Sequence, residues 1–350
     1  MLESLQVLRA IAALMVVVFH LGAPLQRLGL EAPWPQSGAA GVDIFFVLSG
    51  FLMLVTTYGR DGYTGSFYHK RLVRIVPLYW IVTTASLALL LFAPQLVKSG
   101  KAEAWHIIAS YLFLPARHPV LGTLEPLVVP GWTLNYEMFF YLLWGIALLL
   151  PQERRLVGVG AVIAGLSVLG LALPSDNTFF AFYTSSIMLE FVFGLGLGLW
   201  YLNGAPIPRG WGFVLIACGF VSLLSQGEVP PETRWLRWGV PAAMVVAGAL
   251  VLERARPVPR VAALALLGDA SYSLYLVHGM VLSAVGQVFV RLAPSLPLSG
   301  PALYIACGVT AVGAAMVISV LVHLWVERPL LRVMSGRRPV PGKATAERPG

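Results

Sequence analysis

The chain has 350 residues, of which 58% are hydrophobic and only 11% are charged, and it carries a formal net charge of +8. About a quarter of the residues of a soluble domain are charged, so this composition excludes a disordered chain, a secreted disulfide scaffold and an ordinary cytosolic enzyme. The two cysteines, Cys218 and Cys307, lie in apolar runs without metal-ligand spacing. The sequence therefore predicts an all-α, polytopic integral membrane protein with a lipid bilayer as partner and no metal.

Apolar runs of roughly 17–25 residues indicate membrane-spanning helices. About ten such runs are expected, at 6–24, 38–58, 75–94, 131–151, 156–173, 178–202, 210–226, 236–252, 262–290 and 301–326. The first run contains Arg9 and His20 and lacks a cleavage site, so it is interpreted as a helix and not as a signal peptide. We expect a membrane domain over 1–329 and a disordered cytoplasmic tail over 330–350. The loop 95–130 is expected to be re-entrant or interfacial.

Lysine and arginine are distributed unevenly between the two sides of the expected bundle. With the N-terminus inside, 16 of them lie on the cytoplasmic side and 7 on the outer side, while Arg9 lies within the first helix. An even number of helices then places both termini in the cytoplasm. Basic cytoplasmic loops beside anionic lipid explain the net charge, so no nucleic-acid partner is expected.

Ionisable residues inside the expected spans are costly, by roughly 2.5–3.5 kcal/mol each on insertion scales, and mark functional candidates. Arg9 and His20 are eleven residues apart, which places them within about 20° on one helix face and roughly 16 Å apart along it. Asp43, Glu137 and His278 enter from three other helices at the expected depth of His20. Other ionisable groups in the spans are Glu190, Asp269, His323 and Glu327. The pattern predicts a chamber of acids and histidines in the outer half of the membrane.

Arg71 and Arg74 join Arg9 at the expected cytoplasmic mouth of this chamber. Arginines bind phosphate groups as fork-shaped donors, and a coenzyme A thioester combines a phosphorylated head with a thin arm that could reach His20. An imidazole that titrates near neutrality suits a general base for an attacking hydroxyl. Asp43 or Glu137 could orient that imidazole, as the acid does in catalytic triads. Trp132 and His278 are the candidates for binding the acceptor.

Six segments at these positions resemble the bacterial membrane acyltransferase-3 family, which O-acylates surface polysaccharides, lipid-linked sugars and some small molecules. They occur in the order of the family across nearly the whole chain. The matches are Arg9-x10-His20, FFVLSG at 45–50, RLVR at 71–74, WTLNYEMFFY at 132–141, SYSLYLVH at 271–278 and ERP at 327–329.

The resemblance implies about ten helices, an acyl-CoA donor, His20 as the essential catalytic histidine with Arg9 as its partner, and Arg71 and Arg74 on the donor side. We therefore expect an O-acyltransferase, most simply an O-acetyltransferase, in the bacterial inner membrane. It would move an acyl group from a cytoplasmic acyl-CoA to a hydroxyl of an envelope saccharide or glycolipid. An acyl-histidine intermediate is a variant of this mechanism.

Simpler interpretations exist for the same residues. Arg9 could extend to the lipid headgroups, Arg71 and Arg74 could only fix the topology, and Asp43 could cap a helix. Glu137 could be a structural partner of an arginine. A proton-coupled transporter would use the same histidines and acids as a relay, but no internal repeat supports it. A structural scaffold in a surface-polymer assembly is a third interpretation.

Overall fold

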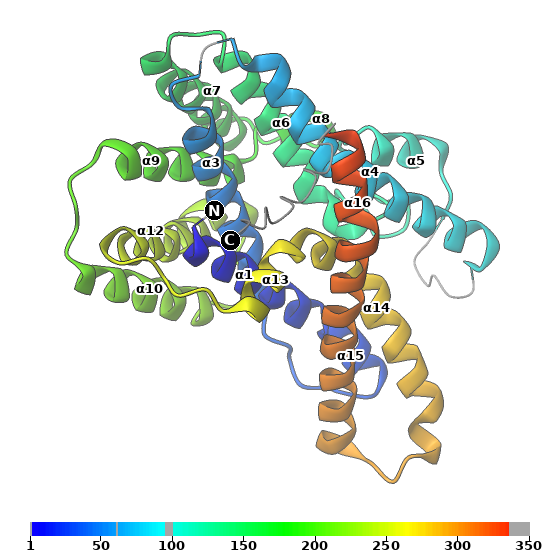
Figure 1. Cartoon of the computed structure of the whole chain (residues 1–350). Coiled ribbons are helices and arrows are strands. Elements are labelled where there is room, and N and C mark those ends of the chain that lie inside the picture. Colours follow the sequence, from blue (N-terminus) through cyan, green and yellow to red (C-terminus); the bar gives the residue numbers. More distant parts are fainter. Residues whose placement is uncertain (1, 61, 95–100, 336–350) are drawn as a thin grey trace, which may run out of the picture.

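The computed structural model describes residues 2–60, 62–94 and 101–335, and within these ranges it contains helices and no strands (Figure 1). Eight helical segments are long and apolar enough to cross a membrane: Glu3–Arg27, Ser37–Thr57, Thr64–Phe92, Gln152–Ala172, Thr178–Asn203, Pro231–Ala255, Ser271–Ser295 and Gly300–Met334. Two shorter helices, α6 (Trp132–Ala147) and α10 (Arg209–Leu224), overlap the other two expected runs. The prediction of an all-α, polytopic membrane protein is confirmed.

The remaining helices follow in chain order. They are α1 (Glu3–His20), α2 (Gly22–Arg27), α3 (Gly41–Thr57), α4 (Thr64–Phe92), α5 (Ala104–Tyr111), α7 (Gln152–Ala172), α8 (Thr178–Tyr183), α9 (Leu189–Asn203), α11 (Pro231–Arg234), α12 (Val240–Ala255), α13 (Ala262–Asp269), α14 (Ser271–Leu292), α15 (Gly300–Val322) and α16 (Arg328–Met334). Short 3-10 segments and π-helical turns join several of them.

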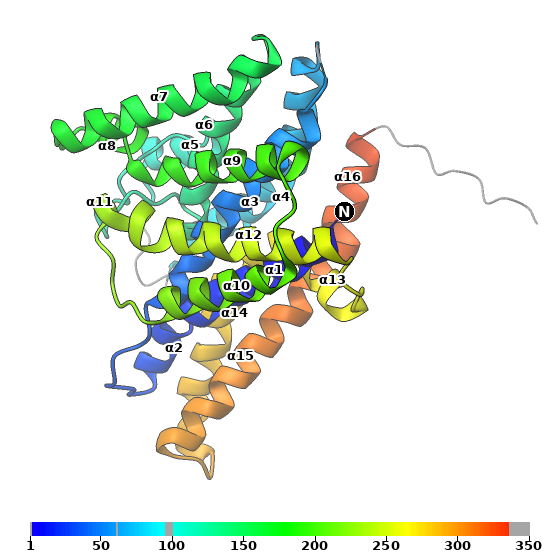
Figure 2. The ribbon, with the colours of Figure 1, turned by 90° about the vertical axis from the view of Figure 1, so that its left-hand side faces the viewer.

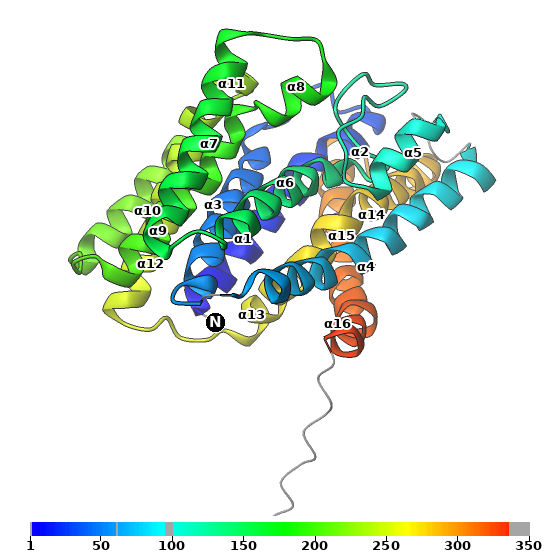
Figure 3. The same cartoon turned by 90° about the horizontal axis from the view of Figure 1, so that it is seen from above.

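The bundle has two distinguishable ends. The N-terminus, α13 and α16 lie at one end, which we call the N-terminal end, whereas α8 and α11 lie at the opposite end, the far end (Figures 2 and 3). Helices α14 and α15 form a long hairpin that extends away from the rest of the bundle (Figure 1).

Close approach of α3 and α9 depends on two glycines. A Cβ atom at Gly50 would lie 2.0 Å from the carbonyl oxygen of Phe191, and one at Gly194 would lie 2.0 Å from that of Val47. Small residues permit such contact between helix backbones in membranes, where no hydrophobic effect drives helices together. The two glycines therefore fix the position of α3, which carries candidate site residues.

Three boundaries differ from the sequence-based expectation. The run 262–290 is divided into α13 and α14 at Ala270, and α4 begins at Thr64, so its arginines lie within a helix. Helix α16 extends to Met334, past the domain boundary expected at 329, because the apolar run of α15 continues through a π-turn. Residues 336–350 of the expected tail and residues 95–100 of the expected interfacial loop lie outside the described residues; the rest of that loop contains α5.

Candidate active site

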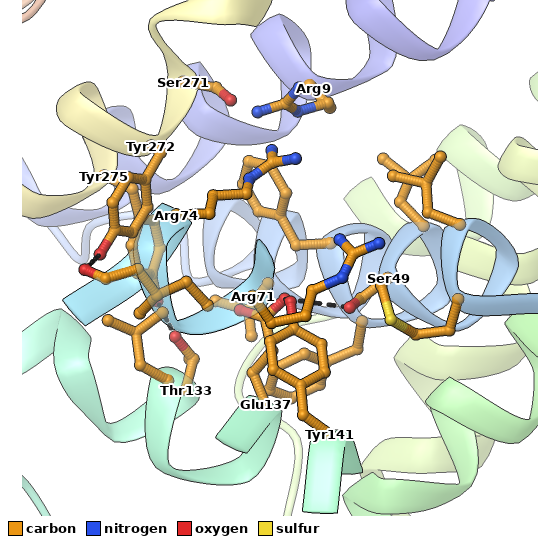
Figure 4. Close-up of a pocket in the computed structure, with 18 residues that line it drawn as sticks. Arg9, Ser49, Arg71, Arg74, Thr133, Glu137, Tyr141, Ser271, Tyr272 and Tyr275 are labelled. Atoms are coloured by element: carbon orange, nitrogen blue, oxygen red, sulfur yellow. Dashed lines mark hydrogen bonds between the residues drawn. The ribbon is translucent and has the colours of Figure 1, made fainter. Parts of the chain in front are cut away.

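Three arginines from two helices point into one cavity. Arg9 of α1 and Arg71 and Arg74 of α4 line a space of about 100 Å³, which we call the arginine cavity (Figure 4). The helical spacing of Arg71 and Arg74, three residues apart, places both on one face of α4. The expected grouping of these three residues is therefore present in the structure, and it concentrates positive charge in a largely buried space.

Hydrogen bonds hold two of these guanidinium groups in place. Arg9 is 7% exposed, and its Nη1 donates to Oε1 of Gln6 at 3.1 Å, while Nε2 of Gln6 donates to Asp269. Arg71 Nη2 donates to Oγ1 of Thr56 at 3.3 Å. The buried Nε of Arg71 has no hydrogen-bond partner among the described residues. A buried donor without a partner is unfavourable, so this atom is available to an acceptor oxygen of a ligand.

Glu137 lies in the arginine cavity and not beside His20. Its Oε1 accepts a hydrogen bond from Oγ of Ser49 at 3.0 Å and another from the hydroxyl of Tyr141 one turn later on α6. Tyr141 in turn lies under Arg71, with the guanidinium carbon 5.8 Å from the ring centroid. The carboxylate therefore faces the cationic side chains of this cavity and belongs to their charge balance.

His20 and His278 form a pair of imidazoles between α1 and α14. Nδ1 of His20 lies 2.9 Å from the carbonyl oxygen of Val16 and 3.2 Å from Nε2 of His278. Nδ1 of His278 lies 3.1 Å from the carbonyl oxygen of Leu274. Because a carbonyl only accepts, both Nδ1 atoms carry hydrogen when the rings are neutral. His278 Nε2 then accepts from His20, and the lone pair on Nε2 of His20 has no hydrogen-bond partner in the described part of the chain.

The histidine pair does not line the arginine cavity. Tyr275 stands between them: it lines the cavity, its hydroxyl lies 2.9 Å from Oγ1 of Thr133, and its ring centroid is 6.1 Å from that of His278. The lining of the arginine cavity, as far as the structure describes the chain, stops at Tyr275 and does not reach His20. The expected open path from the arginines to His20 is therefore not present in the described part of the chain, and Tyr275 lies on the side of the cavity nearest to His278.

Asp43 has a different partner from the one expected. Its fully buried carboxylate binds Arg234 of α11 in a bidentate manner, with Nε–Oδ1 at 3.0 Å and Nη2–Oδ2 at 2.8 Å. The equally buried Glu190 lies within electrostatic range of both residues. The expectation that Asp43 orients His20 finds no support in this arrangement, because both of its oxygens are occupied by Arg234.

Sequence reasoning assigned Arg234 to an outer loop and missed its role. Two unpaired acids in neighbouring spans, Asp43 and Glu190, are the signal that could have found it, since a buried carboxylate requires a cation or donors nearby. The first-turn position of Asp43 on α3 could not reveal which neighbouring helix end supplies that cation.

Trp132 lines a second cavity, of about 540 Å³, which we call the Trp132 cavity. Its wall includes Trp132 and Tyr136 of α6, Arg234 of α11, the α5–α6 loop, the end of α7, and α8. It therefore lies at the far end of the bundle, and it shares no lining residue with the arginine cavity. The ring of Trp132 lies under Arg234, with 5.6 Å between the guanidinium carbon and the ring centroid.

Comparisons with known proteins identify the family of the chain. A family described as an acyltransferase domain matches residues 2–320. The chain belongs to the acyltransferase-3 family. It is 36% identical over 309 residues to the exopolysaccharide production protein ExoZ of Rhizobium meliloti, which covers 88% of this chain and 94% of that protein.

Two further relatives are more distant. The acyltransferase MdmB of Streptomyces mycarofaciens is 27% identical over 388 residues, covering 99% of this chain and 97% of that protein. A Staphylococcus aureus (strain COL) protein, whose name assigns it provisionally as an O-acetyltransferase, is 27% identical over 335 residues, covering 83% of this chain and 52% of its own length. No solved structure matches the chain significantly. The acyltransferase-3 member described here is a multi-pass membrane O-acyltransferase, which sets the transporter interpretation aside.

Proposed function

We propose that this O-acyltransferase takes its acyl group from an acyl-CoA, most simply acetyl-CoA, whose phosphates bind at the arginine cavity. The observation that carries the proposal is the convergence of Arg9, Arg71 and Arg74 on one space at which the Nε donor of Arg71 has no partner among the residues that the structure describes. Arginine is suited to phosphate because its planar fork donates two parallel hydrogen bonds. The donor binds from the cytoplasm, and the bundle lies in the bacterial inner membrane.

His20 acts as the general base in this proposal. Its Nε2 lone pair removes the proton from an acceptor hydroxyl, and the hydroxyl oxygen attacks the thioester carbonyl. The carbon–sulfur bond breaks, and the coenzyme A thiolate takes the proton from the imidazolium. His278 stabilises that imidazolium because its Nε2 accepts the hydrogen on Nδ1 of His20. No metal ion is required for these steps.

Tyr275 must move for the thioester to reach His20. The hydrogen bond between its hydroxyl and Thr133 contributes about 0.5–1.5 kcal/mol to stability, and its buried ring also packs edge-to-face on Phe45. The contacts of a bound acyl-CoA arm would replace both interactions. In the proposed cycle, donor binding displaces Tyr275 and connects the two parts of the site.

The proposed acceptor is a hydroxyl of an envelope saccharide or glycolipid. Its support comes from the relative ExoZ, whose name refers to exopolysaccharide production. The acceptor would approach from the far end of the bundle, opposite the donor, so that acyl transfer takes place across the membrane.

Acetyl transfer by the purified chain tests this function. The wild-type protein and His20→Ala, in detergent, are incubated with radiolabelled acetyl-CoA and saccharide fractions of the bacterial envelope. We expect labelled saccharide with wild type and a loss of at least 100-fold with His20→Ala, since a general base contributes about 10²–10⁴-fold. Coenzyme A should still raise the melting temperature of the variant. Unchanged transfer by His20→Ala contradicts the proposed role of this histidine.

A further inference from the structure

Arg234 presents one free edge to the Trp132 cavity. Its Nε and Nη2 are bonded to Asp43, and Nη2 is also 3.4 Å from the carbonyl oxygen of Ala39. The guanidinium carbon lies 4.8 Å from the ring centroid of Trp238 and 5.6 Å from that of Trp132. No hydrogen bond to Nη1 occurs among the described residues, and the residue lines the cavity. The protein thus fixes this guanidinium and leaves Nη1 as a donor for a ligand.

The charges around Arg234 disfavour an anionic ligand. Asp43 pairs with this single cation through two hydrogen bonds, so the guanidinium has no surplus positive charge. Glu125 and Glu232 place two carboxyl groups on the cavity wall. A phosphate or carboxylate ligand would meet these two acidic side chains and one arginine that is already paired. The arginine cavity shows the opposite balance, with three arginines and one glutamate.

The remaining wall suits a neutral, hydroxyl-rich ligand. Trp132 and Tyr136 provide aromatic surface, and hydroxyl groups come from the α5–α6 loop, the α7–α8 loop and the segment after α8, among them Thr123 and Ser175. Carboxylates accept hydrogen bonds from sugar hydroxyls, protein hydroxyls both donate and accept them, and an aromatic ring covers the apolar face of a sugar. The volume of about 540 Å³ falls within the usual range for ligand sites, about 300–1,000 Å³.

The Trp132 cavity adjoins the arginine cavity. Phe46 lines the arginine cavity and packs edge-to-face on Trp132 and Tyr136, with ring centroids 6.5 and 6.3 Å away. An acceptor in this cavity is therefore close to the proposed donor site.

We propose that the Trp132 cavity is the acceptor site, that its ligand is an uncharged saccharide, and that Arg234 donates through Nη1 to a sugar oxygen as a specificity-determining residue. This inference rests on the proposed function, because it identifies the acceptor site of that reaction. Asp43 is then a positioning residue that holds Arg234 and does not itself touch the acceptor.

A cavity-filling substitution tests the position of the site. Ala181 of α8 lines the cavity, so Ala181→Trp fills it, while Ala181→Ser is the matched control. Both variants are compared with wild type in nanodiscs, with radiolabelled acetyl-CoA and the uncharged envelope oligosaccharides that pass through an anion-exchange column. We expect the acceptor KM to rise at least tenfold in Ala181→Trp, with an unchanged acetyl-CoA KM, and within twofold of wild type in Ala181→Ser. An unchanged acceptor KM in Ala181→Trp overturns the proposal.

A labelling experiment measures binding of the oligosaccharide without turnover. It uses a protein in which both native cysteines, Cys218 and Cys307, are replaced by serine. Ser175→Cys reports on the cavity, and Gly227→Cys on a neighbouring loop is the control. We expect uncharged oligosaccharides to slow maleimide labelling at position 175 at least threefold and to leave position 227 unaffected. Arg234→Lys should abolish most of this protection. No protection by oligosaccharides that the wild type acetylates overturns the proposal, as does protection by inorganic pyrophosphate that depends on Arg234.

The two experiments separate this inference from the proposed function. Protection at position 175 without any transfer from acetyl-CoA supports the acceptor site and contradicts the proposed donor. Transfer with a wild-type acceptor KM in folded Ala181→Trp supports the donor and contradicts the acceptor site.

Discussion

Nε2 of His278 lies 3.2 Å from Nδ1 of His20, so that an imidazole on α14 accepts a hydrogen bond from an imidazole on α1. The carbonyl of Leu274 fixes the orientation of the first ring and the carbonyl of Val16 that of the second. This pair sets the tautomer of His20 and leaves its Nε2 free to act as a base.

Substitution of His278 should therefore affect turnover more than donor binding. We expect His278→Phe to lower kcat about 10–1,000-fold with an unchanged acetyl-CoA KM, because the fixed acceptor for His20 is lost. His278→Gln, which retains an acceptor oxygen, should recover part of the activity. Steady-state kinetics of both variants measures this, and equal loss in the two would indicate a purely structural role.

Removal of one arginine from the arginine cavity should weaken donor binding. A hydrogen bond to a charged group contributes about 1.5–3 kcal/mol, so we expect Arg74→Gln to raise the acetyl-CoA KM roughly 10–150-fold. The control is Arg154→Gln, at an exposed arginine on α7, which should leave that KM within twofold. An acetyl-CoA KM that is equal in both variants argues against phosphate binding at this cavity.

The buried pair of Asp43 and Arg234 should be important for stability. Asp43→Asn leaves the guanidinium buried without its counter-charge, and loss of one partner of such a pair costs about 3–5 kcal/mol. Glu3→Gln removes a longer and more exposed ion pair, 3.9 Å from Arg260, and should change stability by no more than about 1 kcal/mol. Thermal unfolding in detergent compares the two variants, and similar melting temperatures would contradict the prediction.

Because α3 and α9 are in close contact, we expect that adding one methyl group at this contact lowers the stability of the protein. Gly50→Ala would place a Cβ atom 2.0 Å from a backbone oxygen, so the helices must separate, at a cost of about 1–3 kcal/mol. Gly165→Ala on α7 is the control, since a Cβ atom there meets nothing within 4 Å. We expect a lower melting temperature and a lower folded yield for Gly50→Ala only, as measured by size-exclusion fluorescence.

His118, in the loop between α5 and α6, should make this loop sensitive to pH. Its Nδ1 accepts hydrogen bonds from the amides of Val120 and Leu121, and burial together with the nearby His106 lowers its pKa below the usual 6.5. The folded state therefore favours the neutral ring. Its contribution to stability is complete above about pH 6.5 and is lost as the pH falls through the lowered pKa.

Hydrogen exchange at residues 118–123 tests this pH dependence. The amide protection, corrected for intrinsic rates, should decrease between pH 7.5 and 5 in wild type. His118→Asn retains a side-chain acceptor but does not titrate, so its protection should change less over the same range. Equal changes in both proteins would show that another group is responsible.

From the sequence, the ionisable residues inside the membrane spans could be identified, but the side chains that they contact could not. The spacing of Arg71 and Arg74 and the cost of Arg9 in a span were sufficient to group these arginines, because depth and helix face follow from residue number. Asp43 was one of two acids considered as a partner of His20, whereas it pairs with Arg234. Its depth is readable from its position on α3, but the helix that it faces depends on how the bundle packs. The contact of Glu137 with Ser49 could not be predicted either, because it also depends on how the helices pack, and the hydrogen bond from Tyr141 to Glu137 was not predicted.

The three rings of Phe46, Trp132 and Tyr136 also bear on the integrity of the membrane. In the proposed reaction the two substrates come from opposite sides of the membrane, and such an enzyme must avoid becoming a channel, since a continuous water column would dissipate the ion gradients that the cell maintains. These mutually packed aromatic side chains lie between the arginine cavity, which Phe46 lines, and the Trp132 cavity, which the other two line. On this proposal the acyl group crosses the bilayer as a small covalent unit while protons and solutes stay on their own sides.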